Sequence, residues 1–125
     1  MKSVAVLGAS TNLEKYGYRA VVAFAARGFT VYPINPRADQ VAGHPCLPDL
    51  AAVPVRPDVV TAYLPPKLLL ATLSAVAECG CDELWLNPGT DTPEVLSRAA
   101  ELGLNTVQGC SLVALASGRL QAADE

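Results

Sequence analysis

The chain has 125 residues, of which 51% are hydrophobic and 17% are charged, and its formal net charge is −3. This length suits a single domain with one core, and this composition excludes a disordered chain. The acidic balance excludes a basic field for nucleic acid, and no apolar run approaches the ~20 residues that span a bilayer, so we expect neither a nucleic-acid nor a membrane partner.

The first element expected is a strand over Val4–Leu7, an apolar run typical of a strand that is buried on both faces. Gly8 ends it where the backbone must turn, and Ser10 and Asn12 are both plausible N-caps for a helix that starts near Tyr16. A strand, a glycine turn and a helix N-terminus form an anion site, because amide N–H groups and the helix dipole point at one spot. We expect this turn to hold the pyrophosphate of a nucleotide. The alternative is a turn that binds nothing.

A helix over residues 18–27 is expected next, ended by Gly28. One apolar face of this helix is expected to be buried, made of Val21, Val22, Phe24 and Ala25. The second strand covers residues 29–34, and after Asn-Pro-Arg at 35–37 a loop runs from residue 38 to 48. A short helical turn at residues 48–50 follows.

The second half of the chain alternates in the same way. Strands are expected over residues 58–64, 83–86 and 104–107, and helices over residues 67–78 and from Thr92, as N-cap, to Gly103. A small apolar stretch at 111–116 closes the domain, and residues 121–125 form a polar tail. Strands that alternate with helices predict α/β architecture: a single Rossmann-like domain over residues 1–120, with a five-stranded, mostly parallel sheet and helices on both faces.

Glycine or proline follows four of the expected strands, at Gly8, Pro36, Pro65-Pro66 and Pro88-Gly89. In sheets of this class, ligands bind in the crevice beyond the carboxyl ends of the strands. These turns together are therefore the candidate site. Nearby, Lys15 could add positive charge, and Tyr16 could close over a ligand; solvent exposure and helix packing are the alternatives.

Departures from the dinucleotide fingerprint G-x-G-x-x-G/A indicate which kind of nucleotide the site favours. Residues 8–13 read Gly-Ala-Ser-Thr-Asn-Leu, so the second and third glycines are absent. Asn35 stands where an acid would bond the ribose of NAD, and Arg37 follows it. An arginine there favours an extra phosphate on the sugar, which admits NADP or coenzyme A (CoA) and disfavours NAD.

Several segments resemble the small stand-alone CoA-binding domain proteins and, with them, the CoA-binding N-terminal domain of the succinyl-CoA synthetase α subunit. The resemblance runs from Lys2 to about Leu120 and rests on residues 6–10, 18–19, 31–37, 64–66, 84–89 and Cys110. It implies a Rossmann-like fold that binds coenzyme A. It places the pyrophosphate over Gly8, Ala9, Ser10 and Asn12, the 3′-phosphate ribose near Asn35, Pro36 and Arg37, the adenine against Leu64, Pro65 and Pro66, and the pantetheine towards Asn87, Pro88 and Gly89.

One departure from the family concerns the last strand. Many members carry an Asp-Arg-Cys triplet there, whereas this chain has Gln108-Gly109-Cys110. A role that depends on that arginine is therefore not expected here. Cys110 could form a mixed disulfide with the thiol of CoA, although inert burial is the usual fate of a lone intracellular cysteine.

No catalytic constellation can be drawn from the sequence. An acyl-CoA synthetase needs a phosphorylated histidine and a nucleotide-grasp partner, and this chain has only His44, in a loop. The four cysteines suit reduced thiols in the cytoplasm, and no metal site is expected. We therefore expect a non-catalytic CoA or acyl-CoA binding protein. The alternatives are a small NADP-binding oxidoreductase or redox-sensing subunit, and an interaction subunit whose partner supplies the chemistry; a homodimer is left open.

Overall fold

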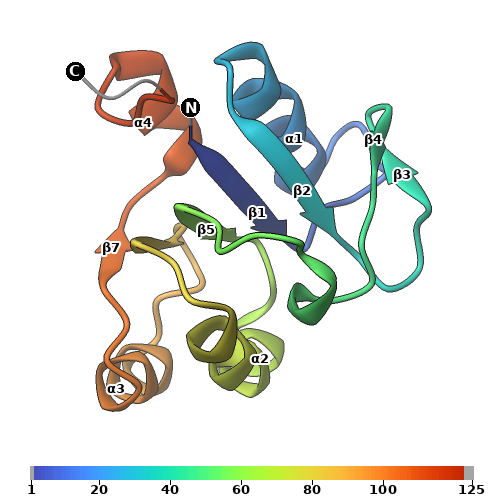
Figure 1. The fold of residues 1–125 in the computed structure, drawn as a ribbon. Coiled ribbons are helices and arrows are strands. Elements are labelled where there is room, and N and C mark those ends of the chain that lie inside the picture. The colour runs from blue at the N-terminus through green and yellow to red at the C-terminus, as the bar shows by residue number, and fades with distance from the viewer. Residues whose placement is uncertain (1, 123–125) are drawn as a thin grey trace.

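The computed structural model describes residues 2–122 and contains a main sheet of five parallel strands (Figure 1). The strands lie in the order β2-β1-β5-β6-β7. Their bounds are β1 Ser3–Leu7, β2 Thr30–Ile34, β5 Val59–Ala62, β6 Glu83–Leu86 and β7 Thr106–Gln108. Each neighbouring pair is parallel. The predicted Rossmann-like α/β fold is thus confirmed.

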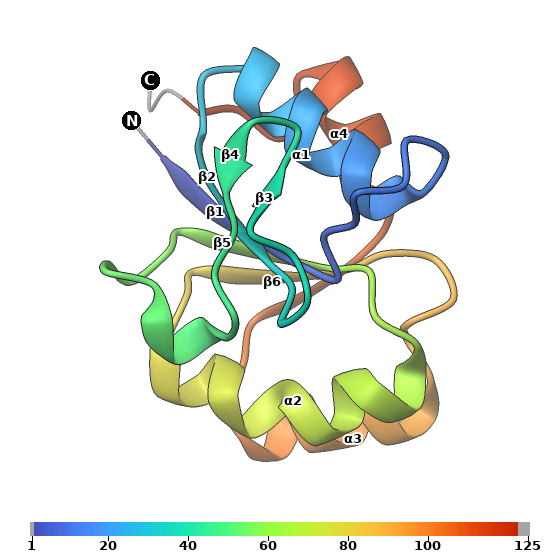
Figure 2. The same cartoon turned by 90° about the vertical axis from the view of Figure 1, so that its right-hand side faces the viewer.

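Helices cover both faces of this sheet. Their bounds are α1 Tyr16–Ala26, α2 Pro66–Cys79, α3 Pro93–Glu101 and α4 Ser111–Ser117, with a short 3₁₀ turn at Leu50–Ala52. Helices α1 and α4 lie on one face, and α2 and α3 lie on the other (Figures 1 and 2). Within residues 2–122, no helix combines the length and the apolar character needed to cross a membrane.

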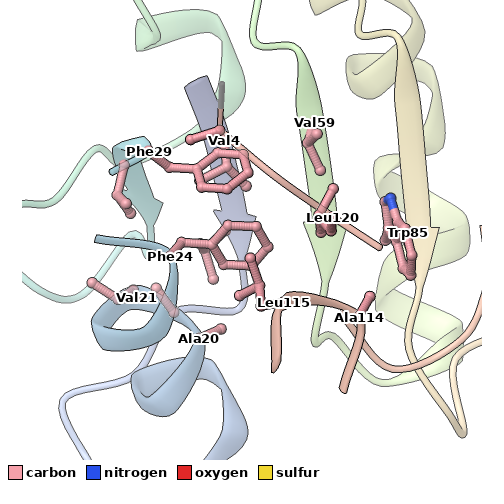
Figure 3. Close-up of a cluster of buried hydrophobic side chains, with 14 of the residues drawn as sticks. Val4, Ala20, Val21, Phe24, Phe29, Val59, Trp85, Ala114, Leu115 and Leu120 are labelled. Carbon is pink, nitrogen blue, oxygen red and sulfur yellow. The ribbon is translucent and has the colours of Figure 1, made fainter. Parts of the chain in front are cut away.

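Two buried clusters of apolar side chains, one on each face, hold the layers together. Strand β1 supplies both: Val4 and Val6 point to the side of α1 and α4, whereas Ala5 and Leu7 point to the side of α2 and α3. Figure 3 shows the first cluster, in which the Phe24 and Phe29 rings meet edge to face with centroids 4.9 Å apart. Burial of every residue of β1 explains the continuous apolar run at residues 4–7.

The start of α1 differs from the prediction. Lys15 is the N-cap, and no side chain caps the helix, so the predicted caps Ser10 and Asn12 are wrong. Instead, the Ser10 hydroxyl accepts a hydrogen bond from the Asn12 amide at 3.0 Å, and the Asn12 side-chain oxygen accepts one from the Glu14 amide at 3.0 Å. Both side chains stabilise turns of the loop that precedes the helix, because their short reach favours local backbone partners.

The buried face of α1 also differs from the prediction. Its fully buried residues are Gly17, Ala20, Val21 and Phe24. Val22 is 45% exposed, and Ala25 is only half-buried. The spacing of three and four residues starts from Gly17, in the first turn of the helix, and this turns Val22 towards solvent.

Residues 38–48 were expected to form an irregular loop, but they contain an antiparallel hairpin of β3 (Gln40–Val41) and β4 (His44–Pro45). Ala42, with a φ of 50°, and Gly43, with a φ of 82°, make its turn. An alanine is unusual in this left-handed region, which is why the turn was missed. The hairpin is anchored to β2, because the Asn35 amide donates to the Leu47 carbonyl at 2.9 Å.

Other local predictions are confirmed in part. Thr92 caps α3, as predicted, by accepting a hydrogen bond from the Val95 amide. The short helical turn predicted at residues 48–50 lies at Leu50–Ala52, and Asp49 is its N-cap. The stretch at 111–116 is helix α4. Of the predicted polar tail, Ala122 is buried and its carbonyl accepts a hydrogen bond from the Lys2 amide at 3.0 Å, whereas residues 123–125 lie outside the described part.

Candidate functional site

A cleft of about 1090 Å³ lies beyond the carboxyl ends of the strands. Strands β1 and β5 are neighbours, but α1 follows β1 on one face of the sheet and α2 follows β5 on the other (Figure 2). Where the chain leaves adjacent strands in opposite directions, it leaves a crevice at the sheet edge. The volume is sufficient for an extended small molecule.

The structure brings together nearly all of the predicted site residues. Those that line the cleft are Gly8, Ala9, Ser10, Tyr16, Asn35, Pro36, Arg37, Leu64, Pro65, Pro66, Asn87, Pro88 and Gly89. Asn12 does not line it and lies in the exposed loop before α1. Cys110, half-buried, lines the cleft beyond β7. Six residues that the sequence did not suggest also line the cleft: Glu14, Gly17, Ile34, Tyr63, Leu68 and Thr90.

Two glycines allow close backbone contacts at the end of β1, Gly8 with the segment after β5 and Gly17 with the turn after β1. Gly8 has a φ of +81°, and a Cβ there would lie 2.8 Å from the Tyr63 carbonyl oxygen. A Cβ on Gly17 would overlap the Gly8 carbonyl oxygen. Gly17 therefore permits the tight helix–strand packing that the third glycine of the dinucleotide fingerprint permits elsewhere. The sequence did not predict this packing role of Gly17, because Gly17 lies too far from Gly8 in the chain to belong to the fingerprint.

Amide N–H groups at this turn and at the start of α1 have no partner within the described residues. The N–H groups of Ala9 and Ser10 donate to no acceptor within residues 2–122. The N–H groups of Tyr16 and Gly17 precede the first bond of α1, which Tyr18 donates to the Lys15 carbonyl at 3.1 Å. Such amides at a helix N-terminus attract phosphate or carboxylate.

Two cationic side chains border the same end of the cleft, Lys15 before α1 and Arg37 after β2, and both are exposed. The acidic Glu14 also lines the cleft. Along the rest of the lining, beyond β5, β6 and β7, the described residues carry no charge. The electrostatic character of the cleft therefore changes from cationic beside β1 and β2 to neutral beside β6.

Asn35 joins the two turns at the cationic end. Its side-chain nitrogen donates to the Ala9 carbonyl at 2.8 Å, and its side-chain oxygen accepts from the Arg37 amide at 2.8 Å. These bonds fix the position of the turn that carries Arg37 relative to the glycine turn after β1. The predicted contact of Asn35 with a ribose stays a prediction, and the structure gives this side chain a positioning role that the sequence did not indicate.

Asn87 has a buried side chain, 3% exposed, that is fully engaged within the protein. Its nitrogen donates to the Thr61 hydroxyl at 2.8 Å and to the Ala62 carbonyl at 2.9 Å. Its oxygen accepts from the Ser111 amide at 2.8 Å and the Ser111 hydroxyl at 3.0 Å. A side-chain amide has two donors and two lone pairs, so no capacity is left for a ligand. Asn87 instead ties β5, β6 and α4 together.

Tyr63 is half-buried directly after β5, and its hydroxyl lies 2.7 Å from that of Ser111. Burial raises the pKa of the Tyr63 phenol, and the hydrogen bond to Ser111 offsets part of that rise. The phenol is therefore neutral at physiological pH. Sequence pattern gave no signal for this residue, because a tyrosine near the end of a strand is usually explained by packing.

Away from the cleft, Cys79 and Cys81 flank the turn between α2 and β6. Burial is the main cause that raises the pKa of the Cys81 thiol from 9.0 to about 11, although Arg56 lowers it in part. No group of three or more His, Cys, Asp or Glu residues in the described part is placed to hold a metal ion.

The raised pKa predicts slow alkylation of Cys81. At pH 8 its thiolate fraction is about 0.1%, against about 10% for an ordinary thiol, and only the thiolate reacts. Allowing for the higher nucleophilicity of a basic thiolate, we expect iodoacetamide to modify Cys81 at least about tenfold more slowly in the folded protein than in urea. The rate should keep rising with pH from 9 to about 11. Peptide mass spectrometry measures both, and a plateau near pH 9 would contradict the assignment.

Comparison with known proteins identifies the domain. Residues 2–116 match the family model described as a CoA binding domain. Among solved structures, a conserved hypothetical protein from Pyrococcus furiosus has a TM-score of 0.83 at 30% identity, covering 90% of this chain and 98% of that one. The dinucleotide forming acetyl-coenzyme A synthetase 1 of Ca. Korarchaeum cryptofilum, in complex with phosphate and ADP, has a TM-score of 0.74 at 27% identity, covering 85% of this chain and 25% of that one.

Two curated relatives are much longer proteins. The ADP-forming acetate–CoA ligases II and I of Archaeoglobus fulgidus are 33% identical over 81 residues and 35% identical over 79 residues. Each alignment covers 63% of this chain, but only 12% and 11% of the two ligases. With the family model matched from residue 2 to 116, the chain belongs to the CoA-binding domain family, as its resemblance to the succinyl-CoA synthetase domain implied.

Proposed function

We propose that the cleft binds coenzyme A or an acyl-CoA, and that the chain acts as a binding module. The observation that carries this proposal is the meeting, at one edge of the sheet, of the glycine turn after β1, its unused amides and Arg37. Membership of the CoA-binding domain family supports the same ligand.

In this proposal each part of the ligand has its own part of the cleft. The diphosphate lies over the turn from Gly8 to Ser10, where amides and the N-terminus of α1 favour negative charge. Arg37 contacts the 3′-phosphate on the ribose, because a guanidinium can form two parallel hydrogen bonds with a phosphate group. The adenine packs on Leu64, Pro65 and Pro66, and the neutral pantetheine passes towards the turn after β6.

The lining of the cleft gives no support to the histidine-based chemistry of an acyl-CoA synthetase. Among the described residues that line the cleft, Glu14 is the only carboxylic acid and none is a histidine. His44 lies in the hairpin, outside this lining. General acid–base catalysis needs a group of suitable pKa within reach of the substrate, and a phosphorylated histidine intermediate needs a histidine there. We place the protein in the cytoplasm, because its four cysteines are free and reduced thiols are usual in that compartment.

Replacing Arg37 with alanine tests the proposed function. We expect the affinity for CoA to fall roughly tenfold, which is the scale of one charge-assisted hydrogen bond. Dephospho-CoA lacks the 3′-phosphate, and its affinity should change little. Calorimetric titration of both ligands measures the difference. Arg98→Ala on α3, outside the lining of the cleft, is the matched control and should bind both ligands as the wild type does. Equal losses for both ligands would remove Arg37 from the 3′-phosphate site.

A further inference from the structure

A hydrogen-bonded cluster is formed by the side chains of Thr61, Tyr63, Asn87 and Ser111. The backbone partners of this cluster determine which group donates and which accepts in each of its hydrogen bonds. The Ala62 carbonyl can only accept and the Ser111 amide can only donate. These two backbone partners therefore decide which end of the Asn87 side chain is nitrogen and which is oxygen, an assignment that otherwise depends on the network as a whole.

The hydroxyl groups follow from that assignment. The Asn87 oxygen can only accept, so the Ser111 hydroxyl, 3.0 Å away, donates its single proton there. The Ser111 oxygen must then accept from its two other neighbours, the Thr61 hydroxyl at 2.9 Å and the Tyr63 hydroxyl at 2.7 Å. The proton of Tyr63 is thereby committed to Ser111, which is fully buried at 0% exposure.

The Tyr63 oxygen has accepting capacity left after this bond. Towards any ligand in the cleft, which Tyr63 lines, its hydroxyl can act only as an acceptor. Tyr63 follows β5, between the cationic end of the cleft beside β1 and β2 and the neutral end beside β6. When the phosphates of a ligand occupy the cationic end, the uncharged part of that ligand lies beside Tyr63.

We propose that Tyr63 is a specificity residue of the cleft, whose oxygen accepts a hydrogen bond from an amide N–H in the neutral arm of the ligand. This inference rests on the proposed function, because the pantetheine arm of CoA carries two secondary amides. The buried network of Thr61, Asn87 and Ser111 holds Tyr63 in its accepting state, so the preference is built into the fold before the ligand arrives.

Tyr63→Phe separates this contact from binding in general. The test titrates the wild type and the variant by calorimetry with CoA and with adenosine 3′,5′-bisphosphate, which keeps the nucleoside and two phosphate positions but lacks the pantetheine arm. We expect the variant to bind CoA roughly fivefold more weakly, the scale of one neutral hydrogen bond, and to bind the bisphosphate as the wild type does. Tyr32→Phe, on β2 outside the lining, is the matched control and should leave both affinities unchanged.

The other results overturn the inference in distinguishable ways. Unchanged CoA affinity in Tyr63→Phe, with a wild type that binds CoA, removes the hydrogen bond and leaves the proposed function standing. Equal losses for both ligands show a general disturbance of the cleft and likewise refute a contact with the arm. A wild type that does not bind CoA refutes the proposed function itself.

Discussion

Replacing Gly17 with alanine is expected to lower the free energy of unfolding by about 3 kcal/mol and to abolish the proposed binding of CoA. The added Cβ would overlap the Gly8 carbonyl oxygen and would lie 3.3 Å from the Ala9 Cα. Both are backbone atoms, so no side chain can rotate away and α1 must move off the end of β1. That shift would loosen the packing of Phe24, which is fully buried, and would displace the amides at the cationic end of the cleft.

Urea unfolding followed by circular dichroism measures this effect. Gly109→Ala is the matched control, because Gly109 has no positive φ and a Cβ there would come no closer than 3.8 Å to the Trp85 ring. We expect that control to change stability by less than about 1 kcal/mol. A Gly17→Ala variant as stable as the wild type would show that α1 does not pack against the glycine turn as described.

The second large effect is expected from Asn87→Ala, which should cost about 3–5 kcal/mol of unfolding free energy. The change removes four hydrogen bonds and leaves the Ser111 amide and the Ala62 carbonyl without their partner in the core. An unsatisfied buried polar group costs about 1–3 kcal/mol, and the vacated volume adds to it.

The control for this variant is Asn105→Ala. Asn105 is exposed and makes one side-chain hydrogen bond, to the Asp82 carbonyl at 3.0 Å, so its loss should cost less than about 1 kcal/mol. Urea unfolding of both variants gives the comparison. Similar small losses in the two variants would mean that water or a relaxed backbone replaces the Asn87 contacts, and the network would not hold β5, β6 and α4 together.

The architecture of the main sheet was predictable because each of its five strands carries its own signal. A strand buried on both faces needs a continuous apolar run, as in β1, and the alternation of such runs with helices permits few topologies. The position of the cleft follows from the same logic: in a parallel sheet the carboxyl ends of all strands meet at one edge, so turns as far apart in sequence as Gly8 and Pro88 had to come together.

What the sequence could not predict depends on contacts between distant segments. Ser10 and Asn12 have the composition of helix caps, but the helix starts beyond their reach, at Tyr16. The hydrogen bond between Asn87 and Ser111 spans 24 residues of sequence, and the hydrogen bond between Thr61 and Ser111 spans 50. No local pattern distinguishes such a buried asparagine from one that contacts a ligand. Gly17 likewise has a meaning only once the Gly8 carbonyl is seen against it.

Direct titration of the wild-type protein with CoA, NADP and NAD, side by side in one calorimetric experiment, tests the central claim that this cleft holds a diphosphate nucleotide with an additional sugar phosphate. We predict saturable binding of CoA well below ~1 mM, weaker binding of NADP and the weakest binding of NAD. Absence of heat with millimolar CoA, or a clear preference for NADP or NAD, would contradict the account.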